Sequence, residues 1–260
     1  MEPDLTMLRE LVEASPEVVV RPGRGVPEEL IRQAEALIGP LSPSYRWWLA
    51  EYGSAQLGGE WLATLAPPEH RAHAHDELTT AWRRTGDRLC FHTEADGGDT
   101  YYFALDERVG AEHPVVRVGH DGDEEPYADS FAGFLTVQVA LANRLRDGPN
   151  PDLARLWRLT PGVLLPNGVL IYGPHTIAER NETYEVHRYA PHWVLIGDDS
   201  GGSGLFMRRH GRDRTSVHRL DLGAIEEDIA TAAGQRLTGD LLGWLGQGAD
   251  MTRHQYSSGQ

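Results

Sequence analysis

The amino-acid sequence predicts an α+β fold, and two periodicities and a repeat support this prediction. Near the N-terminus, apolar residues recur every three or four positions, which is the spacing of one face of a helix. After residue 60, short apolar runs separated by glycine-containing turns are typical of strands. A faint repeat, in which residues 91–103 align with residues 195–207, indicates that the two halves share a strand–turn–strand unit.

Three helices are predicted in the first half. The segment 26–39 begins with a proline and two glutamates, which suit the positive end of the helix dipole, and it ends at a Gly-Pro pair. The segment 42–53 has Ser42 as its expected N-cap and a proline as its first helical residue. Ser130 is expected to cap a third helix that includes residues 131–141.

Short strands account for most of the remaining apolar residues. They are predicted at residues 88–92, 101–105, 115–118, 163–172, 184–187, 193–196, 205–208 and 216–220. An acidic turn with a Gly-Gly pair, residues 96–99, separates the first two, and residues 119–126 are expected to form an acidic loop. A closing helix is predicted at residues 238–245.

The segment 147–152, with the sequence DGPNPD, has the composition of a linker. We therefore predict two units, residues 1–149 and residues 150–260. Either is long enough to bury a sizeable core, since a domain of about 130 residues removes roughly two-thirds of its unfolded surface from water.

The charge of the chain is strongly negative and unevenly distributed. There are 24 basic residues, all of them arginine, against 39 acidic residues, for a net charge of −15. Residues 1–149 contain 26 acidic residues and 13 arginines, so most of the excess lies in the first half. Such a chain is not expected to bind nucleic acid, because this binding depends on cations that neutralise phosphates.

Cysteine content and hydropathy restrict the class further. The single cysteine, Cys90, excludes an intrachain disulfide and a cysteine-rich zinc site. The acidic start is unlike a signal peptide, and the apolar runs are far shorter than the roughly 20 residues of a membrane helix. We therefore expect a cytoplasmic protein that does not associate with membranes.

Two segments carry residue types used in catalysis. Asp199-Ser200-Gly201-Gly202 is comparable to the nucleophile segment of serine proteases, but no histidine-containing base segment accompanies it. His70, with His73, His75, Asp76 and Glu77, could hold a divalent metal, although the polar, alanine-rich context is equally typical of a solvated segment.

The acidic run between Asp121 and Glu125 fails the EF-hand pattern, because Pro126 and Ala132 stand where a glycine and a glutamate are required. The sequence therefore predicts neither a catalytic residue nor a bound metal or cofactor.

Several motifs resemble the SUKH superfamily, which includes the Smi/Knr-type cell-wall regulators. In the first half they are VPEELIRQAEALIG (26–39), LSPSYRWWLAEYG (41–53) and YADSFAGFL (127–135). In the second half, LPNGVLIY (165–172), IAERNETYEV (177–186) and IGDDSGG (196–202) are similar to the distal part of the domain. Paired helices do not precede them, so the resemblance implies a full domain followed by a truncated one.

The resemblance implies a mostly antiparallel sheet flanked by helices and, in bacteria, an immunity protein that binds a toxin and covers its active surface. The acidity of the first half is compatible with a basic toxin, such as a nuclease, because opposite charges accelerate association. Solubility alone is an equally good explanation of this acidity. The candidate partner-binding residues are Asp121, Asp123, Glu124, Glu125, Asp198 and Asp199.

Two alternatives remain. The first is a non-catalytic scaffold or regulator of the Smi/Knr type, which binds partners without inhibiting them. The second is a metal-dependent enzyme that uses the segment from His70 to His75. The oligomeric state does not follow from the sequence.

Overall fold

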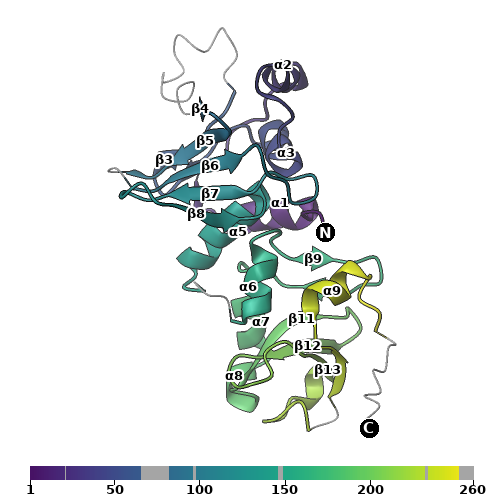
Figure 1. Cartoon of the computed structure of the whole chain (residues 1–260). Coiled ribbons are helices and arrows are strands. Elements are labelled where there is room, and N and C mark those ends of the chain that lie inside the picture. Colours follow the sequence, from purple (N-terminus) through teal and green to yellow (C-terminus); the bar gives the residue numbers. More distant parts are fainter. Residues whose placement is uncertain (21, 66–81, 96–97, 146–148, 232–233, 252–260) are drawn as a thin grey trace, which may run out of the picture.

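The computed structural model describes residues 1–20, 22–65, 82–95, 98–145, 149–231 and 234–251 (Figure 1). The α+β prediction is confirmed, since helices and strands are mixed along the chain and all the described strand pairs are antiparallel. One larger sheet belongs to each half of the chain. Within the described residues, no helix has the length and apolar character needed to cross a membrane.

The first half is built on a five-stranded sheet of order β4-β5-β6-β7-β8 and a small sheet of order β1-β2-β3. Its elements are α1 (Leu5–Ala14), β1 (Val19–Val20), α2 (Glu28–Ile38), α3 (Pro43–Glu51), β2 (Gln56–Leu57), β3 (Glu60–Trp61), β4 (Arg83–Thr85), β5 (Arg88–Thr93), β6 (Thr100–Ala104), β7 (Val115–Val118), β8 (Glu124–Ala128) and α5 (Phe131–Ala142). Helices α1, α3 and α5 share one hydrophobic core with the five-stranded sheet.

Aromatic rings make up the centre of this first core. The ring of Tyr45 on α3 lies 4.9 Å from the rings of both Phe103 and Phe131, centroid to centroid, and Phe91 stacks on Phe103 at 4.3 Å. The hydroxyl of Tyr45 is buried and donates a hydrogen bond of 2.7 Å to the carbonyl oxygen of Ala63. Burial raises the pKa of this phenol, so it stays a neutral donor and joins α3 to the segment after β3.

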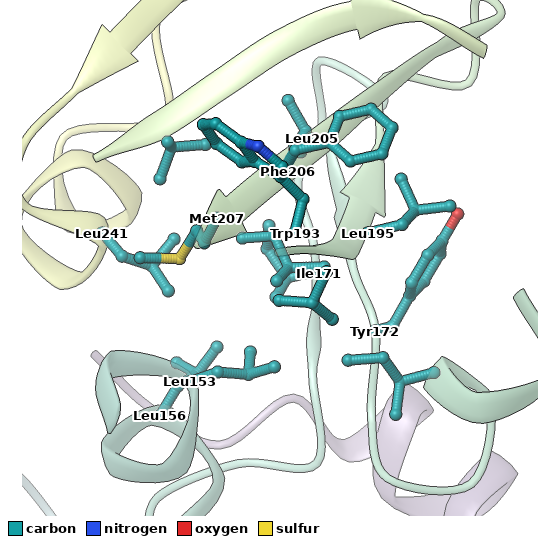
Figure 2. Close-up of a cluster of buried hydrophobic side chains, with 14 of the residues drawn as sticks. Leu153, Leu156, Ile171, Tyr172, Trp193, Leu195, Leu205, Phe206, Met207 and Leu241 are labelled. Carbon is teal, nitrogen blue, oxygen red and sulfur yellow. The ribbon is translucent and has the colours of Figure 1, made fainter. Parts of the chain in front are cut away.

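The second half is built on a six-stranded sheet of order β14-β13-β12-β11-β10-β9. Its elements are α6 (Pro151–Trp157), β9 (Val163–Leu164), β10 (Leu170–Ile171), α7 (Ile177–Thr183), α8 (Val186–Tyr189), β11 (Trp193–Asp198), β12 (Ser203–Arg208), β13 (Val217–Asp221), the 3-10 turn η3 (Leu222–Ala224), β14 (Gln235–Thr238) and α9 (Leu241–Gly246). Figure 2 shows Leu153 and Leu156 of α6 beneath Met207 and Leu241, so α6 covers part of this core.

The central hairpins of the two large sheets share a β-bulge. In the β5–β6 pair the register shifts around Phe91, and in the β11–β12 pair it shifts around Ile196. The carbonyl oxygen of each bulged residue accepts a hydrogen bond from an earlier segment, from Ala63 N at 2.8 Å and from Tyr172 N at 2.9 Å. The bulge therefore joins the hairpin to the segment that follows an earlier strand, β3 in the first half and β10 in the second.

The last strand and the following helix also correspond. The β7–β8 and β13–β14 pairs both shift register near the end of the sheet. Two residues after each last strand comes the N-cap of a helix, Ser130 before α5 and Asp240 before α9. Their side chains accept hydrogen bonds from Gly133 N at 2.8 Å and Gly243 N at 3.0 Å.

The N-terminus of α5 is packed directly against the second half of the chain. Asp129 N donates to the carbonyl of Arg158 at 2.7 Å, and the Ser130 hydroxyl donates to the carbonyl of Leu159 at 2.5 Å. A Cβ atom at Gly133 would lie only 1.6 Å from the Arg158 carbonyl oxygen. The Ser130 cap was predicted, whereas this backbone contact between the halves was not.

A buried carboxylate joins three segments of the first half. Glu112 is 2% exposed and accepts hydrogen bonds from Ser44 N at 2.9 Å and the Ser44 hydroxyl at 2.8 Å. The same hydroxyl oxygen accepts a bond of 3.3 Å from Ala132 N at the start of α5. The predicted N-cap Ser42 stands where expected, but its hydroxyl accepts a bond from His113 N, so Glu112 supplies the α3 cap.

The strand predicted at residues 184–187 is wrong, because the first two of these residues link two short helices and the last two form the first half of the second, α8. Tyr184 and Val186 do face the core, but four residues do not distinguish alternation from a single helical turn. The side chain of Asn181 favours helices in this segment. It bonds to both Leu195 N at 2.9 Å and Leu195 O at 2.8 Å, which holds α7 against β11.

Three other expectations need correction. Residues 119–126 are not a loop throughout, because Glu124 begins strand β8. Thr238 ends strand β14 rather than opening the closing helix, which starts at Leu241. In the expected linker, Asn150 is buried, caps α6 and donates to two carbonyls of the second half. Independent folding of residues 1–149 and 150–260 stays a prediction.

We expect Gly133→Ala to destabilise the protein by about 3 kcal/mol, because the added methyl group overlaps a carbonyl oxygen in the junction. Gly246→Ala is the matched control. It lies at the end of α9 with open space around its Cβ position, and alanine there should be neutral or stabilise by up to about 1 kcal/mol. Urea unfolding monitored by circular dichroism measures the stability of both variants. Equal effects on stability would contradict the close packing at Gly133.

We expect Glu112 to give stability a specific pH dependence. Burial raises its pKa above the ordinary 4.5 although the Ser44 bonds oppose this, so the folded state holds the proton more tightly than the unfolded state. Its contribution to the free energy of unfolding is therefore complete below pH 4.5 and falls as the pH rises through the folded pKa.

Chemical unfolding of the wild type and Glu112→Gln between pH 3 and 7 tests this expectation. The stability difference, wild type minus variant, should decline with rising pH. The same change at the exposed Glu107 of this loop is the control, and a Glu112 difference that rises with pH would contradict the burial argument.

Candidate partner-binding surfaces

Two turns gather acidic residues at one end of the first sheet. Because β5, β6, β7 and β8 pair in sequence, the β5–β6 and β7–β8 turns lie at the same end. A Cβ at Gly119 would lie 2.9 Å from a carboxylate oxygen of Asp121 and 3.8 Å from one of Asp99, so the turns are adjacent. We call this surface the acidic end, and it consists of Glu94, Asp99, Asp121, Asp123, Glu124 and Glu125.

Arginines already neutralise part of the acidic end. Arg117 pairs with Asp99 at 2.8 Å and also with Glu125. Arg88 pairs with Glu124 at 2.9 Å. These pairs are partly exposed, so replacing the arginine partner of a carboxylate by another cation has a small free-energy cost.

Three exposed carboxylates of the acidic end form no ion pair with another described residue, and of these Glu94 accepts a hydrogen bond from the Tyr101 hydroxyl, which leaves Asp121 and Asp123. Their internal contacts are limited to the turn: Asp123 N donates to Asp121 at 3.3 Å, and the carbonyl of Asp123 accepts from Gly119 N at 3.1 Å. Of the predicted partner-binding residues, these two are exposed and have no ion-pair partner among the described residues.

Asp198 and Asp199 are placed differently, in the β11–β12 turn of the second sheet. Asp198 accepts a hydrogen bond of 2.5 Å from the Tyr172 hydroxyl. Asp199 has a side chain only 10% exposed and pairs with Arg219 at 2.7 Å. Both carboxylates thus bind other residues of the same chain, and partner binding through them stays a prediction.

The environment of Asp199 keeps it ionised. Burial acts to raise its pKa, but hydrogen bonds from Ser203 and Gly201 outweigh burial, and the charge of Arg219 adds to them. The pKa of Asp199 therefore lies below its ordinary value of 3.8.

The serine in this turn has a structural role. Ser200 adopts a left-handed backbone conformation, φ 54°, and its hydroxyl donates to the carbonyl oxygen of Gly168 at 2.8 Å. This bond joins the β11–β12 turn to the β9–β10 turn. The resemblance to a protease nucleophile therefore has a conformational explanation.

Metal binding has no support among the residues that the structure describes, where no group of three or more His, Cys, Asp or Glu side chains could hold an ion. The candidate metal segment, His70 to Glu77, lies outside the described residues. The metal-dependent alternative therefore stays untested.

A layer of polar side chains lies behind the acidic end. The Tyr101 hydroxyl donates to Glu94 at 2.7 Å, and the Gln138 amide donates to the Tyr127 hydroxyl at 3.0 Å. Burial raises the pKa of both phenols, that of Tyr127 to about 12. Both stay neutral, so the carboxylate of Glu94 is held by a donor and is less available to a partner than Asp121.

His92 borders a cavity of about 280 Å³ next to this layer. It is 2% exposed, burial lowers its pKa, and its Nδ1 atom has no hydrogen-bond partner. The ring is therefore neutral at pH 7. Neither this histidine nor the buried residues Glu112 and Asn181 could be identified as special from the sequence, because their partners lie in other segments.

Residues 25–137 match the model of the SMI1 / KNR4 family (SUKH-1). The matched segment runs from just before α2 through the five-stranded sheet into α5, and it contains the whole acidic end. The match supports the resemblance to the SUKH superfamily in the first half of the chain. No curated protein matches the chain.

We expect Asp199→Ala to destabilise the protein by about 2 kcal/mol, because it leaves turn amides and Arg219 without their acceptor. Asp123→Ala, at an exposed position in the β7–β8 turn of the first sheet, should change stability by less than about 0.5 kcal/mol.

The effect of Asp199→Ala should depend on pH. Because the folded-state pKa of Asp199 is lowered, its contribution is present above pH 3.8 and is lost as the pH falls through the folded value. Urea unfolding at pH 7 and pH 2.5 measures this, and a loss that grows on acidification would contradict it.

Proposed function

We propose that this protein is a non-catalytic binding protein of the SUKH type that neutralises a basic toxin by covering its active surface, as bacterial immunity proteins do. The match of residues 25–137 to the SMI1 / KNR4 family carries the proposal. The resemblance to the SUKH superfamily implies that a bacterial member acts by binding a protein partner. We propose both the identity of the partner, a toxin, and its basic charge.

The acidic end provides the contact surface in this proposal. It lies within the matched segment, and Asp121 and Asp123 have no neutralising arginine among the described residues. Exposed carboxylates at the end of a rigid sheet create a local negative potential that attracts a basic partner and increases its association rate. Glu124 and Glu125 join this surface by exchanging Arg88 and Arg117 for partner cations.

We propose also that the two halves are related units, a full domain and a truncated one. The corresponding bulges at Phe91 and Ile196 support this relationship, as do the helix caps Ser130 and Asp240. The second unit begins with the single short helix α6, so its sheet depends on the first half for part of its cover.

Binding to the toxin encoded beside the gene for this protein tests the main proposal. We expect tight binding, protection of cells that express the toxin, and an association rate that falls as salt increases. The double variant Asp121→Asn/Asp123→Asn should associate roughly threefold to tenfold more slowly at low salt, with little change in dissociation.

The matched control is Glu226→Gln/Glu227→Gln, which removes the same charge from exposed positions in the second half. It should leave the association rate within about twofold of the wild type. Binding without protection would instead favour the scaffold alternative. Failure to bind the neighbouring toxin, or equal effects of both double variants, would contradict the proposal.

A further inference from the structure

A cleft of about 870 Å³ lies between the two halves of the chain. One side is formed by β8 and the last turns of α5, and the other by α6 with His210 and Arg214. Figure 1 shows α5 and α6 in succession at the junction of the two halves. Asp121 and Asp123 do not line the cleft, whereas Glu125 of the acidic end lies at its edge, paired with Arg117.

The bed of the cleft is apolar. Val137 and Leu141 come from α5, Leu145 from the segment after it, and Trp157 from α6. Leu141 is 41% exposed, although the same helix is otherwise largely buried. An apolar side chain from a ligand would gain by covering this leucine, at about 25 cal/mol for each Å² removed from water.

Cationic side chains surround this bed, in a protein whose net charge is −15. Arg155, Arg158 and Arg214 line the cleft with Arg117. Arg155 is 69% exposed and has only a weak pair of 3.6 Å with Asp152 on its own helix. Arg158 and Arg214 form no ion pair with another described residue.

Two of these arginines have an unmet hydrogen-bonding requirement. The Nε atoms of Arg117 and Arg214 are buried and have no hydrogen-bond acceptor. A buried donor without an acceptor costs about 1–3 kcal/mol. Guanidinium groups match planar carboxylates in particular, because both can form two parallel hydrogen bonds.

We infer that this cleft binds an acidic segment of a partner polypeptide, in which carboxylates flank a large apolar side chain. The apolar side chain lies on Leu141 and Val137, and the carboxylates pair with Arg158 and Arg214. A small inorganic anion would leave the apolar bed uncovered. A nucleic acid would meet a strongly negative protein outside this short cationic rim. The inference does not depend on the toxin proposed above.

Selection from a library of random peptides displayed on phage, with the intact protein as bait, tests the inference. We expect enrichment of peptides that combine Asp or Glu with Leu, Phe or Trp. A fluorescein-labelled copy of the enriched peptide should lose at least tenfold in affinity for Arg158→Glu/Arg214→Glu, because two attractive contacts become repulsive.

The control is Arg24→Glu/Arg188→Glu, which changes the charge equally at positions that do not line the cleft, and it should bind the peptide within about twofold of the wild type. If the cleft double variant fails to fold, Leu141→Ser replaces it, since this side chain is already exposed, and it should weaken binding severalfold.

Three outcomes would overturn the inference: no enriched peptide, enriched peptides without acidic residues, or binding that is insensitive to the cleft variants. A labelled oligothymidylate that binds as tightly as the peptide and is lost with the same variants would also overturn it, because the cleft would then be a phosphate site.

Discussion

The rest of the structure depends on the need to cover helix α5, which has almost no polar face. A helix that is apolar on all sides is stable only when neighbours surround it. Phe131 and Phe134 pack on the first sheet, whereas Ala140 belongs to the core of the second half. Gly133 allows the closest approach, since any side chain there would overlap the Arg158 carbonyl. Both halves of the chain therefore pack against the same helix, α5.

The two candidate binding surfaces are consequences of this arrangement. Near its C-terminal end, α5 is no longer fully covered by neighbouring elements, and Leu141 is exposed. Arginines of the second half lie beside this leucine, and together they line the cleft. At the free end of the first sheet, the strand turns bring separate acidic residues together. One surface is cationic and apolar, the other is anionic, so they suit different parts of a partner or different partners.

Local patterns predicted most helices and strands, because periodicity and turn chemistry act within a few residues. Strand 115–118 and the Ser130 cap were placed correctly. The N-terminal helix α1 was missed, as were the short strands β1, β2, β3 and β4, since two or three residues carry no period. The strand at 184–187 was wrong because Asn181 and the left-handed Glu185 impose helices through contacts that spacing does not reveal. The carboxylates of the candidate site were visible as charges, but their arginine partners were not.

The sequence by itself determined the α+β class, the acidity of the first half and the resemblance of its motifs to the SUKH superfamily, because composition and short motifs are local properties. Only the tertiary structure decided which carboxylates are free. Asp121 and Asp123 remain exposed, whereas Asp199 is held by Arg219 and turn amides. It also decided that an acidic chain has a cationic cleft. Hydrogen bonds and ion pairs join residues that are far apart in the chain, so packing fixes which charges are satisfied and which are left for a partner.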